Sequence, residues 1–359
     1  MDEDPSSLFS LQDVARIMSE LPLQEEHLRE VHDAVNSSSS NGYDEEYTMS
    51  SLFSAPGSGV GDDKAGTKAV SYLRPLKDLF SEYFASNGAG TKGGAADVER
   101  YISALSDSDM QIYWPYSEDW DGETFPLVTF DPGYGAESNY AYVLSYAGGE
   151  ASVVDSVLVT EDVARERPVW VINRNDDSAF TPLELFSTKA ADMKVAASDD
   201  TKGPMLSIKT FKMLRNYDSW FGGASEFFVK CGAVDGFKAS SDSDLKLYTP
   251  SVTDFMISVK RSQCGLSVPF QAIMLTDMTD QMDKVAFLII EDDGGTRTSW
   301  KCEATVKYKS KTYGFDLEIP YNEKDDIVWR GQLSTSFFGE KGDTVSGRFG
   351  DVEVTFELQ

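Results

Sequence analysis

The stretch 110–175 constrains the fold most, because strand-length runs of β-branched and aromatic residues alternate there with turn sequences. The runs are MQIYWPY, FPLVTF, YAYVLSY, SVLV and PVWVIN, and the intervening sequences include SEDWDGE, DPGYGAESN and AGGEAS. Valine, isoleucine and aromatic side chains favour strands, whereas Gly, Pro, Asp, Asn and Ser favour tight turns. This spacing predicts a compact, mainly antiparallel β unit.

A second region, 225–359, repeats strand-length runs at a spacing typical of a β-sandwich. Its last run, DVEVTFEL, alternates most regularly, with Val352, Val354, Phe356 and Leu358 on one face. Such alternation predicts a strand with one buried and one exposed face. Residues 303–319 form a predicted hairpin whose turn is YKSKT.

Two amphipathic helices are predicted before the first β unit, over 67–86 and 95–105. Pro75 lies inside the first one and either kinks the helix or marks its first turn. The first carries the apolar stripe Leu73, Leu76, Phe80 and Phe84, and the second carries Val98, Ile102 and Leu105. We expect both helices to cover one face of the β unit.

The 359 residues exceed one typical domain, so we expect three parts. Residues 1–66 are predicted to form an acidic N-terminal arm of two short helices and a Ser- and Gly-rich linker. The apolar surface of this linker is too small to offset the conformational entropy that it would lose on ordering. Residues 67–222 form an α+β domain and 223–359 a β-sandwich. The fold class is α+β, mainly β: a helix-covered antiparallel β domain followed by an immunoglobulin-like or C2-like sandwich.

Charge excludes one class of partner. Sixty acidic against thirty-two basic residues give a net charge of -28, which repels nucleic-acid phosphates and anionic lipid. The sequence contains no run of 18 or more apolar residues, so it predicts no transmembrane segment. The sequence as given also opens without the basic region and apolar run of a signal peptide, so any leader is absent from it.

Cysteine and histidine usage argues against several kinds of site. Cys231, Cys264 and Cys302 are widely spaced without a CxxC pair. One disulfide with one leftover thiol and three buried free thiols both stay open, and three buried free thiols are favoured. His27 and His32 both fall in the predicted arm, where a solvated helix face is expected. Histidine-dependent catalysis and a three-histidine zinc site would need a histidine in a formed pocket.

Aromatic residues crowd the segment 113–146, beside several acids. Such a loop is able to bind a sugar ring by stacking, while packing in the core and the turns is the competing interpretation. A glycosidase would need two carboxylates about 5 to 9 Å apart, and the pair cannot be chosen among sixty acids. The ligand-binding candidates are Tyr113, Trp114, Tyr116 and Trp120, near the acids Glu118, Asp119 and Asp121.

Calcium is the one cofactor that the sequence suggests. The strand LIIEDDGGT ends in acids at a Gly-Gly turn, and calcium takes six to eight oxygen ligands, so a second acidic loop must converge. The calcium-loop spacing D-x-D-x-D-G is absent, and a solvated hairpin tip is the competing interpretation. The candidates are Glu291, Asp292 and Asp293, with Asp325 and Asp326 or Asp242 and Asp244 as the second loop.

Several strings carry a family resemblance: NGYDEEYTMSSLFSAPGSGVGDD, PLKDLFSEYF, QIYWPYSEDWDG, PLVTFDP and PVWVINRND. Over residues 12–180, and more loosely over the β-rich tail, the chain resembles a family of uncharacterised exported proteins, predicted lipoproteins, of Bacteroidetes. The resemblance implies a periplasmic or surface location in the cell envelope. In this family the mature chain follows a lipidated cysteine, often with acidic residues next. This chain opens with Met1 followed by Asp2, Glu3 and Asp4, without a cysteine.

These observations predict a non-enzymatic binding or adhesion protein at the cell envelope, with a protein or glycan partner and no nucleic acid. The alternative is a carboxylate-dependent hydrolase acting on glycans, suggested by the aromatic and acidic segment 113–146. The sequence predicts no oligomeric state.

Overall fold

The computed structural model describes residues 8–54, 74–87, 95–147, 150–175 and 203–359. The chain divides into two compact units. Unit 1 comprises Met1–Phe180 and Asp218–Gly223, and unit 2 comprises Thr181–Tyr217 and Ala224–Gln359.

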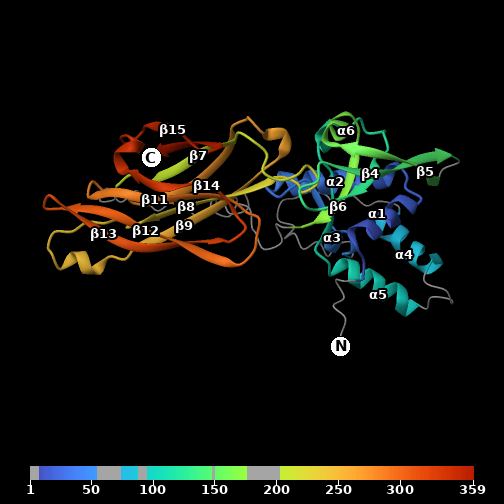
Figure 1. The fold of residues 1–359 in the computed structure, drawn as a ribbon, viewed down its shortest axis with the longest axis horizontal. Coiled ribbons are helices and arrows are strands. Elements are labelled where there is room, and N and C mark those ends of the chain that lie inside the picture. Colours follow the sequence, from blue (N-terminus) through green and yellow to red (C-terminus); the bar gives the residue numbers. More distant parts are fainter. Residues whose placement is uncertain (1–7, 55–73, 88–94, 148–149, 176–202) are drawn as a thin grey trace. The chain divides into compact units, whose positions relative to one another are not determined.

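Unit 1 is built on one six-stranded sheet with the strand order β1-β2-β6-β3-β4-β5 (Figure 1). Neighbouring strands are antiparallel except β3 and β6, which are parallel. The chain leaves β5, passes through the short helix α6 (Glu161–Glu166) and returns as β6 between β2 and β3. The expected antiparallel unit is therefore a mixed sheet. Its strands are β1 (Glu46–Thr48), β2 (Met110–Tyr113), β3 (Leu127–Phe130), β4 (Ser138–Ala147), β5 (Glu150–Thr160) and β6 (Val169–Arg174).

The N-terminal helices belong to the core of unit 1, which corrects the prediction of an arm over residues 1–66. Helix α1 (Leu11–Glu20) begins with a capping box between Ser10 and Asp13 and lies against β3, β5 and β6. Its buried face shares one hydrophobic cluster with α2 (Glu25–Ser40) and with residues of β2 and β6. The apolar stripe of α1 is long enough to need a partner, and the sheet supplies it.

Three further helices complete this side of unit 1: α3 (Met49–Phe53), α4 (Leu76–Asn87) and α5 (Ala95–Ser106). Helix α4 starts directly after Pro75, where the missing backbone N–H is tolerated. The expected first part of this helix, 67–73, lies outside the described residues. Helices α4 and α5 pack on each other and on α3, whereas the contacts with β3, β5 and β6 come from α1.

Strand alternation separates the two faces of the unit 1 sheet. Trp170 and Ile172 of β6 belong to the cluster shared with the helices. Val169 and Val171 belong to a second cluster that includes Trp220. A shift of one residue along a strand therefore moves a side chain between two different environments.

Unit 2 is a sandwich-like pair of sheets around one hydrophobic cluster that includes Phe211, Phe287 and Phe356 (Figure 1). One sheet has the order β10-β7-β16-β15, and the other has the order β13-β12-β11-β8-β9, with β14 also paired to β11. The predicted mainly β fold class is confirmed. The strands are β7 (Leu206–Met213), β8 (Ser225–Ala233), β9 (Ser251–Val259), β10 (Val268–Leu275), β11 (Met282–Glu291), β12 (Arg297–Tyr308), β13 (Lys311–Asn322), β14 (Asp326–Ser334), β15 (Thr344–Phe349) and β16 (Val352–Leu358).

Two local predictions in unit 2 are confirmed. In β16 the residues at alternate positions, from Val352 to Leu358, are buried. β12 and β13 pair as an antiparallel hairpin, and its turn places Lys309 and Ser310 at φ of 49° and 62°. The expected boundary at 222/223 differs from the structure, because β7 pairs with β10 and β16 and so belongs to unit 2.

The three cysteines are free thiols, as expected, but only Cys231 is buried, whereas Cys264 and Cys302 are half-buried. Burial raises the pKa of the Cys231 thiol, and it raises the pKa of Cys302 to about 11. Among the described helices, none is long and apolar enough to cross a bilayer.

Candidate functional site: an aromatic pocket and an acidic group

Unit 1 contains a cavity of about 190 Å³ between the turn that follows β2 and the connection from α6 to β6. Its wall combines aromatic rings, carboxylates and guanidinium groups from two segments of the chain. The lining residues are Trp114, Tyr116, Asp119, Trp120, Asp121, Thr124, Ala164, Arg165, Glu166, Arg167 and Pro168.

The turn after β2 presents this wall. Tyr116 has a left-handed backbone, with φ of 58°, and precedes the 3-10 turn Ser117–Asp119. A bulky residue rarely adopts this conformation, and such backbone strain concentrates at functional sites. The reversal of the chain brings Trp114, Tyr116 and Trp120 to one cavity.

The two tryptophans of the wall are fixed edge to face. The ring centroids of Trp114 and Trp120 lie 5.2 Å apart at 60°, and Trp114 also packs on Trp170 at 5.7 Å. The indole Nε1 of Trp120 donates to the Thr124 carbonyl oxygen at 2.9 Å. Trp114 is 1% exposed, whereas Trp120 is half-buried. The indole of Trp120 is therefore the more accessible of the two.

Tyr116 is held by two charged partners from α6. Its hydroxyl donates to Glu161 Oε1 at 2.6 Å and accepts from Arg165 Nε at 3.1 Å. The Arg165 guanidinium lies 5.4 Å from the centre of the tyrosine ring and pairs with Glu161 at 3.0 Å. Burial, and then the hydrogen bond to Glu161, raise the pKa of Tyr116 to about 12. Tyr116 is thus a neutral phenol near pH 7.

The carboxylate of Asp121 is used to close its own turn. It accepts hydrogen bonds from the backbone of Glu123 and Thr124 and from the Thr124 hydroxyl. The bonds from Thr124 lower the pKa of Asp121, so this group stays ionised. A general acid of a glycosidase needs a raised pKa instead.

Two more polar groups of the lining are exposed. Asp119 lies in the 3-10 turn, and Arg167 follows α6. The Arg167 guanidinium donates one hydrogen bond to the Phe125 carbonyl oxygen at 3.2 Å, which leaves its other N–H groups for further acceptors. The lining therefore offers both an acceptor and a donor beside the aromatic rings.

Three of the four predicted ligand-binding residues meet in this cavity, but Tyr113 does not. Tyr113 is fully buried in the cluster on the opposite face of the sheet, with Val171 and Trp220. It is the last residue of β2, one position before Trp114, so alternation directs the two side chains to opposite faces. Tyr113 is thus a core residue.

His32 is a residue of this region that the sequence analysis missed. Its ring packs on Trp120 at 5.0 Å and on Trp114 at 5.6 Å, so the predicted solvated helix face is wrong. His27 is fully buried, and burial lowers its pKa. One sequence signal for this position was available. His32 follows Leu28 by four residues, so the two side chains share one face of α2, beside its apolar stripe.

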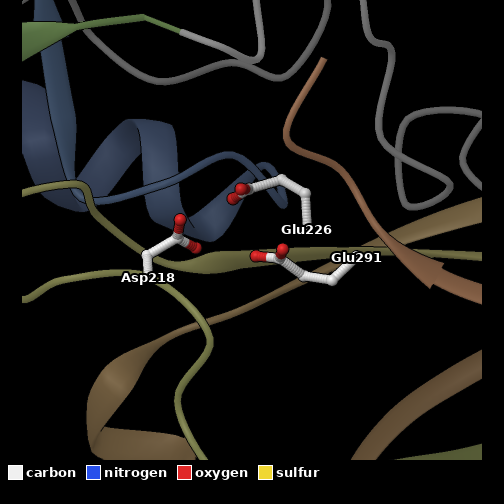
Figure 2. A group of neighbouring side chains, drawn as sticks. All are labelled: Asp218, Glu226 and Glu291. Atoms are coloured by element: carbon white, nitrogen blue, oxygen red, sulfur yellow. The ribbon is translucent and has the colours of Figure 1, made fainter. Parts of the chain in front are cut away.

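A second candidate is a group of three acids, Asp218, Glu226 and Glu291. Each offers one carboxylate oxygen, and these oxygens lie within 4.8 Å of one another, close enough to hold a metal ion. Figure 2 shows the three carboxylates directed toward a common space. Glu226 on β8 and Glu291 on β11 are 4% and 1% exposed. Of the three predicted calcium ligands, Glu291 belongs to this group, whereas Asp292 and Asp293 do not.

Asp292 instead lies beside the loop between β13 and β14. This loop carries Asp325 and Asp326, one of the two acidic loops predicted to converge on it. Asp292 accepts from Gly294 N and from Asn322 Nδ2, and Asp325 accepts from Asn322 N at 2.6 Å and from Asp293 N. Burial, and then a hydrogen bond with Asp292, raise the pKa of Asp325. The other predicted loop is engaged elsewhere, because Asp242 pairs with Lys309 and Asp244 accepts from Ser240 and Ser241.

Comparison of the chain with protein-family models and with curated proteins found no match.

Proposed function

We propose that unit 1 is a non-enzymatic binding module that holds a sugar ring in the aromatic pocket. The observation that carries this proposal is the meeting of Trp114, Tyr116 and Trp120 with Asp119 and Arg167 around one cavity. Its setting is the cell envelope, where a glycan partner would be met. That setting is supported by the family resemblance of residues 12–180.

The chemistry of the lining suits a hydroxylated ring. One face of a pyranose is apolar and packs on an indole or phenol ring, which provides area at low entropic cost. A sugar hydroxyl can donate to the Asp119 carboxylate and accept from Arg167, and hydrogen bonds to charged groups are the stronger ones. The cavity, at about 190 Å³, is smaller than the pockets of about 300–1,000 Å³ that take drug-sized ligands, so one ring is the matching size.

Binding is favoured over catalysis by the state of two lining groups. The carboxylate of Asp121 is tied into its turn with a lowered pKa, and the raised pKa of Tyr116 keeps the phenol neutral. Neither group is prepared as a general acid or as a nucleophile. The alternative, a glycan hydrolase, would depend on Asp119 and Glu166, the remaining carboxylates of the lining.

The proposal is tested by titrating the protein with methyl glycosides while following tryptophan fluorescence, with a glycan array to choose the sugar. Trp120→Ala removes a stacking surface and should weaken binding about tenfold, which corresponds to about 1.4 kcal/mol. Asp119→Asn keeps the shape of an exposed side chain and removes one charged acceptor, so it should weaken binding without lowering the melting temperature. Tyr134→Asn is the matched control, because this aromatic side chain is fully exposed and does not line the cavity.

Two outcomes would contradict the proposal. Failure of the wild-type protein to bind any sugar on the array, with unit 1 folded, would remove the sugar-binding function. Release of a reducing end from a glycan, lost in Asp119→Asn, would establish the hydrolase instead.

For the acidic group we propose calcium as the ion, because carboxylate oxygens are its preferred ligands. The support within unit 2 is that the buried carboxylates of Glu226 and Glu291 come from the neighbouring strands β8 and β11.

Calcium should raise the melting temperature of the wild-type protein and a chelator should reverse the rise, since an ion that binds the folded state stabilises it. Glu291→Gln should abolish the response, whereas Glu323→Gln, an exposed acid of a nearby loop, should keep it. An equal melting temperature with calcium and with chelator would exclude the ion.

A further inference from the structure

The imidazole of His32 contacts two sides of the pocket wall without lining the cavity. Its ring lies 5.0 Å from the ring of Trp120 and 5.6 Å from that of Trp114, at angles of 54° and 66°. The two indoles are also in contact with each other, so the three rings form one aromatic cluster. Helix α2 carries His32 against the turn Ser117–Asp119.

Hydrogen bonds fix the orientation of this ring. His32 Nε2 lies 3.2 Å from the Ser117 carbonyl oxygen, an acceptor, so Nε2 must carry the hydrogen. The amide nitrogen of Asn36 lies 3.1 Å from both Nδ1 and Nε2, and with the hydrogen on Nε2 it is Nδ1 that accepts from it. The tautomer with its hydrogen on Nε2 satisfies both partners, and it ties α2 to the turn that holds Asp119.

Ser117 is tied to a second N-terminal residue as well. Its hydroxyl donates to Glu45 Oε1 at 3.3 Å, and the Glu45 carbonyl oxygen accepts from the backbone of Trp114 at 3.0 Å. Ser117 is buried and does not line the cavity. Residues 32 and 45 thus hold the wall of the pocket through hydrogen bonds to residues that follow them by 69 to 85 positions in the sequence.

We infer that His32 is a positioning residue of the pocket, which sets the tilt of the Trp120 ring and the place of the Ser117–Asp119 turn for the ligand. This inference rests on the proposed function, since it concerns the same pocket. Trp120 is the half-buried indole, and besides its Nε1 bond to Thr124 its ring packs on Trp114 and on His32. The imidazole is one of the two described ring contacts that set the tilt of this indole, and a preorganised aromatic surface binds more tightly than a mobile one.

The test compares His32→Leu with His32→Gln. Leucine fills the space but cannot donate to Ser117, whereas glutamine has an amide N–H that can. Both residues are good helix formers, so α2 itself should persist. Arg29→Gln is the matched control, because Arg29 is exposed on the same helix and pairs only with Glu25 among its described ion pairs.

The first readout needs no ligand. The indole N–H resonance of Trp120, assigned by its loss in Trp120→Phe, should shift most in His32→Leu, less in His32→Gln, which can restore the hydrogen bond but not the ring, and should stay at its wild-type position in Arg29→Gln. The resonances of Trp170 and Trp220 should stay unchanged in all three variants. An unchanged Trp120 resonance in His32→Leu, or shifts of all the indole resonances together, would overturn the inference.

The second readout is the dissociation constant for the sugar that the wild-type protein binds. It should rise about five- to tenfold in His32→Leu, the effect of one lost hydrogen bond with its positioning, and less than about threefold in His32→Gln. Equal affinities of His32→Leu and the wild type would overturn the inference while leaving the proposed function standing. If the wild type binds no sugar, the proposed function fails alone, and the Trp120 resonance decides whether His32 positions the wall.

Discussion

At the scale of single residues, the pair Asp292 and Asp325 shows how two loops of unit 2 are joined by acids. Asp325 is 7% exposed, and both Asp292 and Asp325 accept hydrogen bonds from Asn322. Two neighbouring carboxylates cannot both be ionised without repulsion, and burial adds to the cost of the charge. Both effects raise the pKa of Asp325, burial being the larger.

This pair predicts a pH dependence of the stability of unit 2. The folded-state pKa of Asp325 lies above its ordinary value of 3.8, so the protonated carboxyl group stabilises the folded state. This contribution to the unfolding free energy is fully present below about pH 3.8. The contribution is lost as the pH rises through the folded-state pKa. Asp292→Asn removes the like charge but keeps an oxygen for Gly294 N, so the loss toward neutral pH should become smaller.

The measurement is thermal unfolding at a series of pH values between about 3.5 and 7, in the wild type and in the variant. Glu323→Gln removes an exposed charge from the same loop and serves as the control. The same pH dependence in all three proteins would show that the two acids do not interact.

At the scale of elements, the helices α1 and α2 are where sequence reasoning and structure differ most. The two short helices were readable from the sequence, and both are found. Their place was not readable, because a short acidic segment with an apolar stripe looks the same in an arm as against a sheet. The stripe of α1 is buried in the core of unit 1.

Burial of α1 leads to a prediction that an arm would not share. Ile17 is 3% exposed in the cluster that contains Trp170, so Ile17→Ala should lower the unfolding free energy by about 2–5 kcal/mol. Arg16→Ala, on the exposed side of the same helix, removes only surface ion pairs and should change it by less than about 1 kcal/mol. Urea unfolding followed by tryptophan fluorescence measures both. Equal and small effects would mean that α1 is not docked in solution.

Strands were easier to predict than their partners. The alternation of β16 and the turn of the β12–β13 hairpin are local properties, and both are found as the sequence indicated. The parallel pairing of β3 with β6 and the membership of β7 in unit 2 join segments far apart in the chain. No periodicity within a strand carries that information, because it records which face is buried and not which strand lies beside it.

At the scale of the whole molecule, the pocket shows the same limit. The aromatic residues Trp114, Tyr116 and Trp120 could be selected from the sequence because they cluster locally. Arg165 comes from α6, Arg167 from the connection between α6 and β6, and His32 from α2. The pocket is a property of the assembled sheet and helices of unit 1, so only its local half was predictable.

The order of the strands in unit 2 also has a consequence for synthesis. The central pair of the four-stranded sheet joins β7 to β16, residues 206–213 to 352–358, although β16 is the last strand of the chain as given. During translation β7 leaves the ribosome well before its neighbour exists, while β10 offers it a partner on one edge only. Its other edge stays open to strands of other molecules until Val352–Leu358 emerge, which makes this interval the one in which chaperone binding would matter most for the nascent chain.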